Sequence, residues 1–276
     1  MVAFALLALL ASAAHAQNAL GEEVPYIRTP QAVVDKMLDL AEVGPDDFLI
    51  DLGSGDGRIV ITAALNRGAR GFGVELDPTL VEASNAAALK AGVAGRAQFF
   101  ARDLFETDIR EASVLTMYLL PAVNLELRPR ILSQLRPGTR VVSHDWDMGE
   151  WQPDAKAVLE GLKKPVMPVQ ASTVYLWIVP AKVAGTWKIE LEGASPWPME
   201  IEFTQRFQEI SGVAKRMRGR TFLQSAHLRG AEIRFAVIDD TRRPSVPMQF
   251  FGRVYGDTME GSTGSGRRWR AERKSR

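Results

Sequence analysis

The chain of 276 residues is 46% hydrophobic and contains no cysteine, so it has the composition of a folded protein and cannot form disulfides, thiolate metal sites or cysteine nucleophiles. Its formal net charge of +1 is too small to favour nucleic acid as a partner. The three histidines argue against a histidine-rich metal centre. The composition therefore predicts neither a metal nor nucleic acid as partner.

The first residues resemble an export signal. Residues 3–14 are almost wholly apolar and lead into Ala14-His15-Ala16 before Gln17, the small-x-small pattern that a signal peptidase cleaves. No Lys or Arg precedes Arg28, so the basic n-region is missing, and an uncleaved anchor or a misassigned start is the alternative. The stretch is shorter than the roughly 20 residues of a membrane-spanning helix, so no stable span is expected. We predict a signal peptide over residues 1–16 and a periplasmic or secreted protein; the alternative is a cytoplasmic or membrane-anchored one.

Residues 29–179 predict a parallel sheet covered by helices, because short β-branched runs alternate with longer amphipathic stretches. Thr29-Pro30 predicts the start of a helix that precedes the first strand. In chain order, the elements that follow are strand 48–52, helix 58–66, strand 71–75, helix 78–91, strand 97–101, strand 113–120, helix 123–135, strand 139–144 and strand 174–179.

The pattern changes after Pro180. From Gly185 onward no helical period survives, and strand-like segments alternate with Gly, Pro or Asp-rich turns. We therefore predict one domain over residues 17–183 and a β-rich domain, a small antiparallel barrel or sandwich, over residues 184–276. Residues 261–266 are expected to form a flexible loop, and the basic run 267–276 a solvated tail.

A cofactor motif lies at residues 48–57, where the buried strand FLIDL runs directly into the glycine-rich turn GSGDG that opens a helix. Glycines allow positive φ and close approach of the backbone to a ligand, and a helix N-terminus offers unpaired N–H groups to a carboxylate. Asp51 can face an ammonium group, and Glu75, at the end of the next strand, can accept both hydroxyls of a ribose. This combination predicts S-adenosyl-L-methionine as the cofactor. The predicted binding residues here are Asp51, Gly53, Ser54, Gly55, Asp56, Gly57 and Glu75.

A nucleotide-dependent dehydrogenase is the competing interpretation, since it also uses a glycine turn and an acid on the second strand. Its spacing requires Gly or Ala at position 58, where this chain has Arg58. Asp51 and Asp56 would also repel a pyrophosphate. A merely tight structural turn would leave these acids and Glu75 without a role.

Asp103 follows the third strand, where its side chain could accept a hydrogen bond from an adenine amino group. A helix N-cap explains the same residue equally well.

The methyl acceptor is expected beside Tyr118 and Pro121, because ligands of open α/β sheets bind outside the carboxyl ends of the strands and the fourth strand ends there. Displacement at a sulfonium needs a lone pair about 3 to 3.5 Å from the methyl carbon and the exclusion of water. Tyr118 would either hold a neutral amine by its hydroxyl or pack in the core. Both roles remain open at this point.

Four runs together resemble the seven-β-strand protein lysine methyltransferases: VPYIRTP at 24–30, DLGSGDGR at 51–58, YLLP at 118–121 and SHD at 143–145. That family includes the enzymes that act on the ATP synthase c-subunit and on the adenine nucleotide translocase, with archaeal relatives. The resemblance covers roughly residues 24–180. It implies a Rossmann-like seven-stranded methyltransferase sheet and methylation of a protein lysine, with Tyr26 and Thr29 folding over the cofactor and Tyr118 near the acceptor nitrogen.

The export-like leader and the β-rich second domain depart from this family. Two alternatives therefore accompany lysine methylation. One is a small-molecule N- or O-methyltransferase, because acceptor choice in this fold resides in the loops. The other is an exported protein that binds an adenosyl compound or another ligand without turnover.

Overall fold

The computed structural model describes residues 27–164, 167–193, 199–216, 219–239 and 246–275. The predicted signal peptide and Tyr26 lie outside these ranges. None of the described helices is long and apolar enough to cross a membrane.

The first part of the chain is a seven-stranded sheet in the order β3-β2-β1-β4-β5-β7-β6. The first five strands are parallel, and β6 and β7 form an antiparallel hairpin at one edge. This confirms the predicted Rossmann-like class. The strands are β1 (Phe48–Leu52), β2 (Arg70–Glu75), β3 (Ala97–Ala101), β4 (Val114–Met117), β5 (Arg140–His144), β6 (Ala155–Lys164) and β7 (Met167–Ile178).

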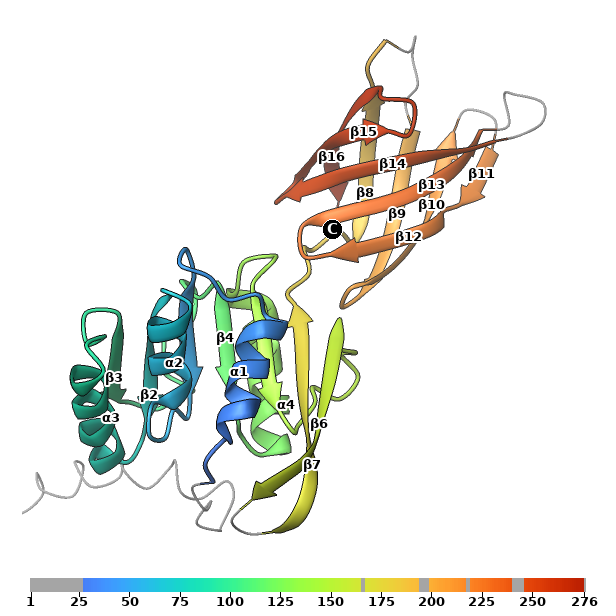
Figure 1. Ribbon diagram of the computed structural model, residues 1–276. Helices are drawn as coiled ribbons and strands as arrows, with labels where there is room; N and C mark the ends of the chain where they lie inside the picture. The colour runs from blue at the N-terminus through green and yellow to red at the C-terminus, as the bar shows by residue number, and fades with distance from the viewer. Residues whose placement is uncertain (1–26, 165–166, 194–198, 217–218, 240–245, 276) are drawn as a thin grey trace, which may run out of the picture.

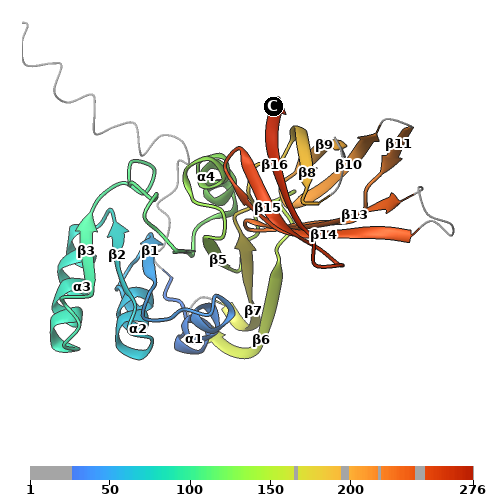
Figure 2. The ribbon, with the colours of Figure 1, turned by 90° about the horizontal axis from the view of Figure 1, so that it is seen from above.

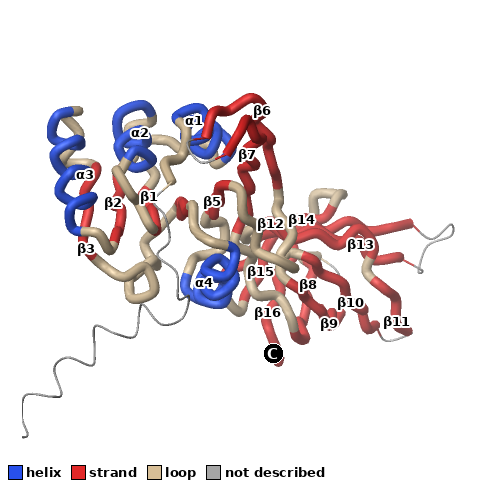
Figure 3. The backbone as a smooth tube through the Cα atoms, turned by 90° about the horizontal axis from the view of Figure 1, so that it is seen from below, coloured by secondary structure: helices blue, strands red, loops and turns tan. Residues whose placement is uncertain are grey.

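Four helices cover the two faces of this sheet: α1 (Gln31–Leu40), α2 (Arg58–Asn66), α3 (Pro78–Lys90) and α4 (Pro121–Gln134). Helices α1, α2 and α3 lie on one face and α4 on the other (Figures 2 and 3). Successive side chains of β1 point to opposite faces of the sheet. Leu49 packs with Val33 and Val60 on the face of α1 and α2, whereas Ile50 packs with Leu127 of α4. A strand buried on both faces is apolar at almost every position, as β1 is.

The second part is a nine-stranded antiparallel sheet that curls into a nearly closed barrel, in the order β11-β10-β9-β8-β16-β15-β14-β13-β12 (Figure 1). Its inward side chains include Trp187, Phe203, Phe235, Phe250 and Trp269. The strands are β8 (Gly185–Leu191), β9 (Met199–Arg206), β10 (Glu209–Arg216), β11 (Gly219–Phe222), β12 (Gln224–Arg229), β13 (Glu232–Asp239), β14 (Val246–Tyr255), β15 (Thr258–Thr263) and β16 (Arg268–Ser275).

The basic C-terminal run is a strand, where the sequence suggested a solvated tail. β16 lies between β8 and β15, with Trp269 and Ala271 buried. The Arg273 side chain is only 7% exposed; its Nε donates to Asp257 Oδ1 at 2.7 Å and its guanidinium stacks 4.2 Å from the Trp187 ring centroid. The strand forms because its inward positions alternate with arginines that face solvent.

The second sheet joins the first at the amino ends of the parallel strands. β7 runs antiparallel to β5, so Ile178 pairs with Arg140 at the start of β5. Beyond it, Ala181 N donates to Gly230 O at 2.8 Å, and the ring of Phe207 stacks on Trp151 with 6.1 Å between centroids. The carboxyl ends of the strands lie at the opposite end of the sheet (Figure 1).

Candidate functional site

The glycine-rich loop between β1 and α2 lies at the carboxyl end of the sheet. Gly53, Gly55 and Gly57 have φ angles of 73°, 53° and 75°, a region in which only glycine is relaxed. A Cβ at Gly53 would stand 2.8 Å from Leu119 Cδ2, and one at Gly57 would stand 2.5 Å from the Phe99 ring. The loop is therefore drawn tightly over the ends of β2, β3 and β4, and only glycine fits at both positions.

Asp51 is the last residue but one of β1 and is 1% exposed. Its Oδ1 accepts a hydrogen bond from Thr116 Oγ1 at 2.7 Å, whereas its buried Oδ2 has no hydrogen-bond partner. Burial raises the pKa of this carboxyl to about 7, and the charges of Glu75 and Asp56 add to the rise. A buried carboxylate oxygen without a partner is costly, and a ligand ammonium group would satisfy it.

Glu75 and Asp56 lie on either side of the loop. Glu75 Oε2 accepts from Gly55 N at 3.0 Å, and Oε1 accepts from Leu76 N at 2.8 Å. Asp56 accepts from Arg58 Nε at 2.7 Å, and this arginine together with Arg28 holds the pKa of Asp56 below its usual range, despite partial burial. Glu75 thus lies against the loop through backbone N–H groups, while Asp56 is neutralised by arginine.

Two other predicted cofactor residues differ in their surroundings. Ser54 is buried, and its Oγ has no hydrogen-bond partner; its side chain packs against Gly73 of β2, where a Cβ would stand 2.6 Å from this oxygen. Asp103 Oδ1 accepts from Phe105 N at 2.7 Å within a turn. No helix follows it, so the helix-cap alternative is wrong and Asp103 closes a turn near the end of β3.

Tyr118 belongs to a cluster at the ends of β4 and β5. Its ring lies on that of His144 with centroids 3.9 Å apart. His144 is fully buried and contacts Thr29 Oγ1 at 3.3 Å through Nδ1 and Ser172 Oγ at 3.0 Å through Nε2. Tyr118 is half-buried; burial first, and then Asp145, raise its pKa to about 12, so its hydroxyl stays protonated at neutral pH.

Thr29 connects this cluster to the cofactor loop. Its side chain meets His144, and its carbonyl accepts from Arg58 Nη1 at 2.7 Å. The structure therefore brings Thr29 close to both the start of α2 and the Tyr118 cluster. Pro121 is the exposed first residue of α4, three positions beyond Tyr118.

Asn124 is a structural residue that sequence reasoning missed. It is fully buried in α4, and its Nδ2 donates to Ser143 Oγ at 3.1 Å and to the carbonyl of Trp146 at 3.2 Å. It therefore holds the segment after β5 against α4. Its place at a helix start directly after YLLP was the available signal.

The residues of the loop fit S-adenosyl-L-methionine. The partnerless Asp51 Oδ2 suits the ammonium of the methionine part, the N-terminal N–H groups of α2 suit its carboxylate, and Glu75 suits the ribose hydroxyls. Among the described residues, no three His, Asp or Glu side chains are grouped as metal ligands.

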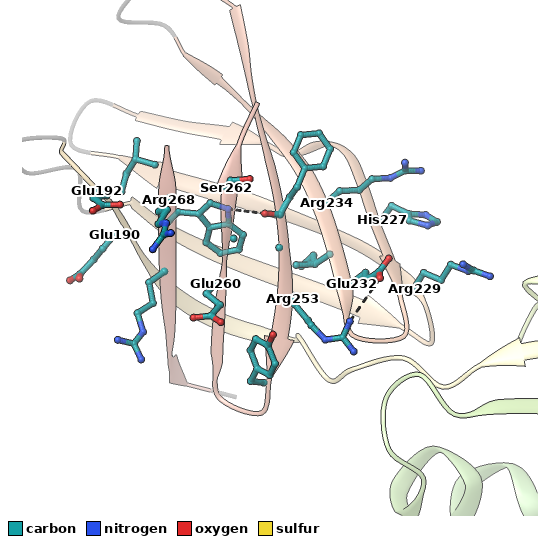
Figure 4. A pocket seen from close by; sticks show the side chains of 18 residues that line it. Glu190, Glu192, His227, Arg229, Glu232, Arg234, Arg253, Glu260, Ser262 and Arg268 are labelled. Carbon is teal, nitrogen blue, oxygen red and sulfur yellow. Dashed lines mark hydrogen bonds and ion pairs between the residues drawn. The ribbon is translucent and has the colours of Figure 1, made fainter. Parts of the chain in front are cut away.

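A separate groove of about 1230 Å³ lies on the outer face of the second sheet (Figure 4). Arginines and glutamates line it together, with Arg253 Nη1 3.9 Å from Glu232 Oε1. Because side chains of both charges line the groove, its charge favours neither an anionic nor a cationic ligand. None of its lining residues belongs to the methyltransferase sheet, so it is not part of the cofactor site.

Comparison with known proteins agrees with the geometry. The family model described as the ANTKMT methyltransferase domain matches residues 51–155. A protein-lysine N-methyltransferase of Saccharolobus islandicus is 42% identical over 161 residues, which are 56% of this chain and 94% of that protein. The adenine nucleotide translocase lysine N-methyltransferase of Mus musculus is 35% identical over 48% of this chain and 58% of its own length.

Among solved structures, a Salinibacter ruber protein described as an RNA methyltransferase in complex with S-adenosyl-L-homocysteine is 54% identical. The match covers 56% of this chain and 95% of that one, with a TM-score of 0.52. The range matched by the family model contains the glycine loop, Glu75 and Tyr118. The chain therefore belongs to the same family of S-adenosyl-L-methionine-dependent methyltransferases as the Saccharolobus islandicus protein.

Proposed function

We propose that the chain methylates the side-chain nitrogen of a protein lysine. The observation that carries this proposal is the similarity to a protein-lysine N-methyltransferase along 94% of that protein's length. The acceptor would lie beside Tyr118 at the carboxyl ends of β4 and β5.

The residues of the site suit an amine acceptor. When bound, S-adenosyl-L-methionine would supply a methyl group on a positively charged sulfur: the lone pair of the neutral amine would attack the methyl carbon, and the carbon–sulfur bond would break to release S-adenosyl-L-homocysteine. Because the pKa of Tyr118 is raised to about 12, its neutral oxygen can accept an N–H bond from the amine and leave the lone pair directed at the methyl group. Leu119 packs against Gly53 and excludes water on the loop side.

RNA is the second candidate acceptor, because the relative that is 54% identical is described as an RNA methyltransferase. The deciding experiment uses three separate incubations of the purified chain with labelled cofactor: one with a total protein extract, one with an RNA extract and one with a small-molecule extract. Mass spectrometry then maps the labelled atoms. Label on protein lysine supports the proposal. Label confined to RNA or to small molecules overturns it, and binding of the cofactor without any transfer leaves a binding protein.

The Tyr118→Phe variant tests the residue. We expect lysine labelling to fall sharply while cofactor affinity stays within about twofold, since the hydroxyl bonds Asp145 and none of the predicted cofactor residues. Undiminished labelling would show that Tyr118 only packs against His144.

We also propose that the protein is exported. The support is the apolar run 3–14 followed by Ala14-His15-Ala16. Intact-mass measurement of the protein from its own cells should give a chain that begins at Gln17. A chain that retains its leader would contradict export by cleavage.

A further inference from the structure

Asp145 stands directly after β5, beside the proposed acceptor position, and its side chain is held in one orientation. Its N–H donates to Thr173 O at 2.7 Å, and its Oδ1 accepts from Thr173 N at 3.0 Å. Its backbone has φ of 63°, one of four non-glycine residues with positive φ in the described ranges. Backbone strain of this kind is concentrated at functional sites. The two hydrogen bonds to Thr173 of β7 also fix the orientation of the carboxylate before any ligand binds.

The second carboxylate oxygen faces the Tyr118 cluster. Asp145 Oδ2 lies 3.4 Å from Tyr118 Oη and 3.4 Å from His144 Nε2. Its side chain is 17% exposed whereas that of His144 is 0% exposed, so of these two neighbours it is Asp145 that solvent and a ligand can reach. A carboxylate and a phenol ring therefore meet at the edge where the acceptor must enter.

We propose that Asp145 recognises the acceptor as a protonated alkyl amine. The inference rests on lysine methylation and names what selects the lysine: a charge-assisted hydrogen bond from the ammonium group to the carboxylate, beside the face of an aromatic ring. A neutral nucleobase amino group or a hydroxyl group could donate only a weaker hydrogen bond to this carboxylate, without the attraction of opposite charges, and the phosphates of RNA would be repelled by it. Asp145 is thus a positioning and specificity residue that acts on binding.

The Asp145→Asn variant isolates the charge. Asparagine has nearly the same size, tolerates positive φ, and keeps an oxygen that can accept from Thr173 N. The matched control is Asp147→Asn, which removes the same charge two residues further along, where the exposed carboxylate accepts from Gly149 N at 2.9 Å.

The acceptor for the test is a synthetic peptide spanning the lysine most strongly labelled in the protein extract. We expect Asp145→Asn to raise KM for this peptide about tenfold or more, the loss expected for one charge-assisted bond. The value of kcat should not fall, because the carboxylate stabilises the charged amine and not its reactive neutral form. Calorimetry should give S-adenosyl-L-homocysteine affinity within about twofold of the wild type for both variants, and Asp147→Asn should leave KM unchanged.

A second measurement omits turnover. The chain saturated with S-adenosyl-L-homocysteine is titrated with the lysine peptide and with the same peptide carrying norleucine in place of lysine. The wild type should prefer lysine, and Asp145→Asn should lose most of that preference, which measures the coupling of the two charges directly.

The outcomes separate the two proposals. If the wild type labels RNA or small molecules and no lysine, lysine methylation fails, and the inference fails with it. If the wild type labels lysine but Asp145→Asn keeps its KM and its preference for lysine over norleucine, only the inference is overturned. A variant whose S-adenosyl-L-homocysteine affinity falls together with its acceptor affinity would also overturn it, since Asp145 would then be structural.

Discussion

Asp51 should make cofactor affinity depend on pH, because burial raises the pKa of its carboxyl to about 7. The charged form, which pairs with the ligand ammonium, therefore predominates only above pH 7. Cofactor affinity should fall as the pH drops below 7. On the alkaline side affinity should also fall, because the ligand ammonium loses its proton near its own pKa, which is about 7.7 to 8.0 for α-amino groups. Calorimetric titration between pH 5.5 and 9 should thus give an affinity maximum near pH 7.5.

Asp51→Asn supplies the control: its affinity should be lower and should no longer weaken toward acid pH. A wild-type affinity that is flat between pH 6 and 8 would contradict the buried, ligand-facing carboxylate. The same pKa affects folding with a defined sign. Between pH 3.8 and about 7 the folded chain keeps a proton that the unfolded chain loses, so the burial of Asp51 costs no stability below pH 3.8 and its full cost applies above pH 7.

Gly57 and Gly92 offer a matched pair at the residue scale. Both have positive φ, at 75° and 71°, but a Cβ at Gly57 would overlap the Phe99 ring while one at Gly92 meets nothing within 4 Å. Gly57→Ala should therefore lower the free energy of unfolding by about 1 to 3 kcal/mol more than Gly92→Ala, the cost of overpacking. It should also abolish cofactor binding. Equal losses in chemical denaturation would show that the loop can move away from Phe99.

At the scale of elements, the stability of the second sheet depends on strand β16, which lies between β8 and β15. The indole of Trp269 lies inward across Gly252, where a Cβ would come within 2.4 Å of its ring, and its Nε1 donates to Phe251 O at 3.1 Å. Trp269→Ala should destabilise the sheet by about 3 to 5 kcal/mol. Arg270→Ala, at the next and exposed position, should change it by less than about 0.5 kcal/mol.

The measurement is amide hydrogen exchange across β14, β15 and β16, which reports this sheet separately from the first. Protection should collapse there in Trp269→Ala and persist in β1 and β4. Unchanged exchange in that variant would mean that the C-terminal run contributes little to the sheet.

At the scale of the whole molecule, the second sheet attaches at the end opposite to the cofactor loop, through Gly230 and through Phe207 against Trp151. A chain that ends at Ala184 should therefore bind S-adenosyl-L-methionine within about twofold of the full chain, because the cofactor loop lies at the other end of the first sheet from the removed part. Calorimetry on both chains measures this. A shortened chain that is folded by circular dichroism but does not bind would place the second sheet within the functional unit of the first.

Phe207→Ala in the full chain complements the truncation. It removes the stack on Trp151 without exposing the rest of the interface, and cofactor affinity should again be unchanged. Reduced affinity in this variant would indicate that the interface supports the cofactor loop from a distance.

The sequence alone determined the parallel sheet, the cofactor and most of the cofactor loop. These follow from local patterns: a buried strand, a glycine turn and a helix within residues 48–66, and an acid at the end of the next strand. The same local rules missed the long β6–β7 hairpin and placed β16 in solvent, because single strands of mixed composition gain their stability from neighbours distant in the chain.

Only the tertiary structure decided what surrounds Tyr118. The contact of Thr29 with His144 joins residues 115 positions apart, and that of Tyr118 with Asp145 joins residues 27 apart. Pairing of β5 with β7 then sets Asp145 against Thr173. No local pattern encodes such contacts, since they depend on strand order and register, which burial and pairing across the whole sheet fix together.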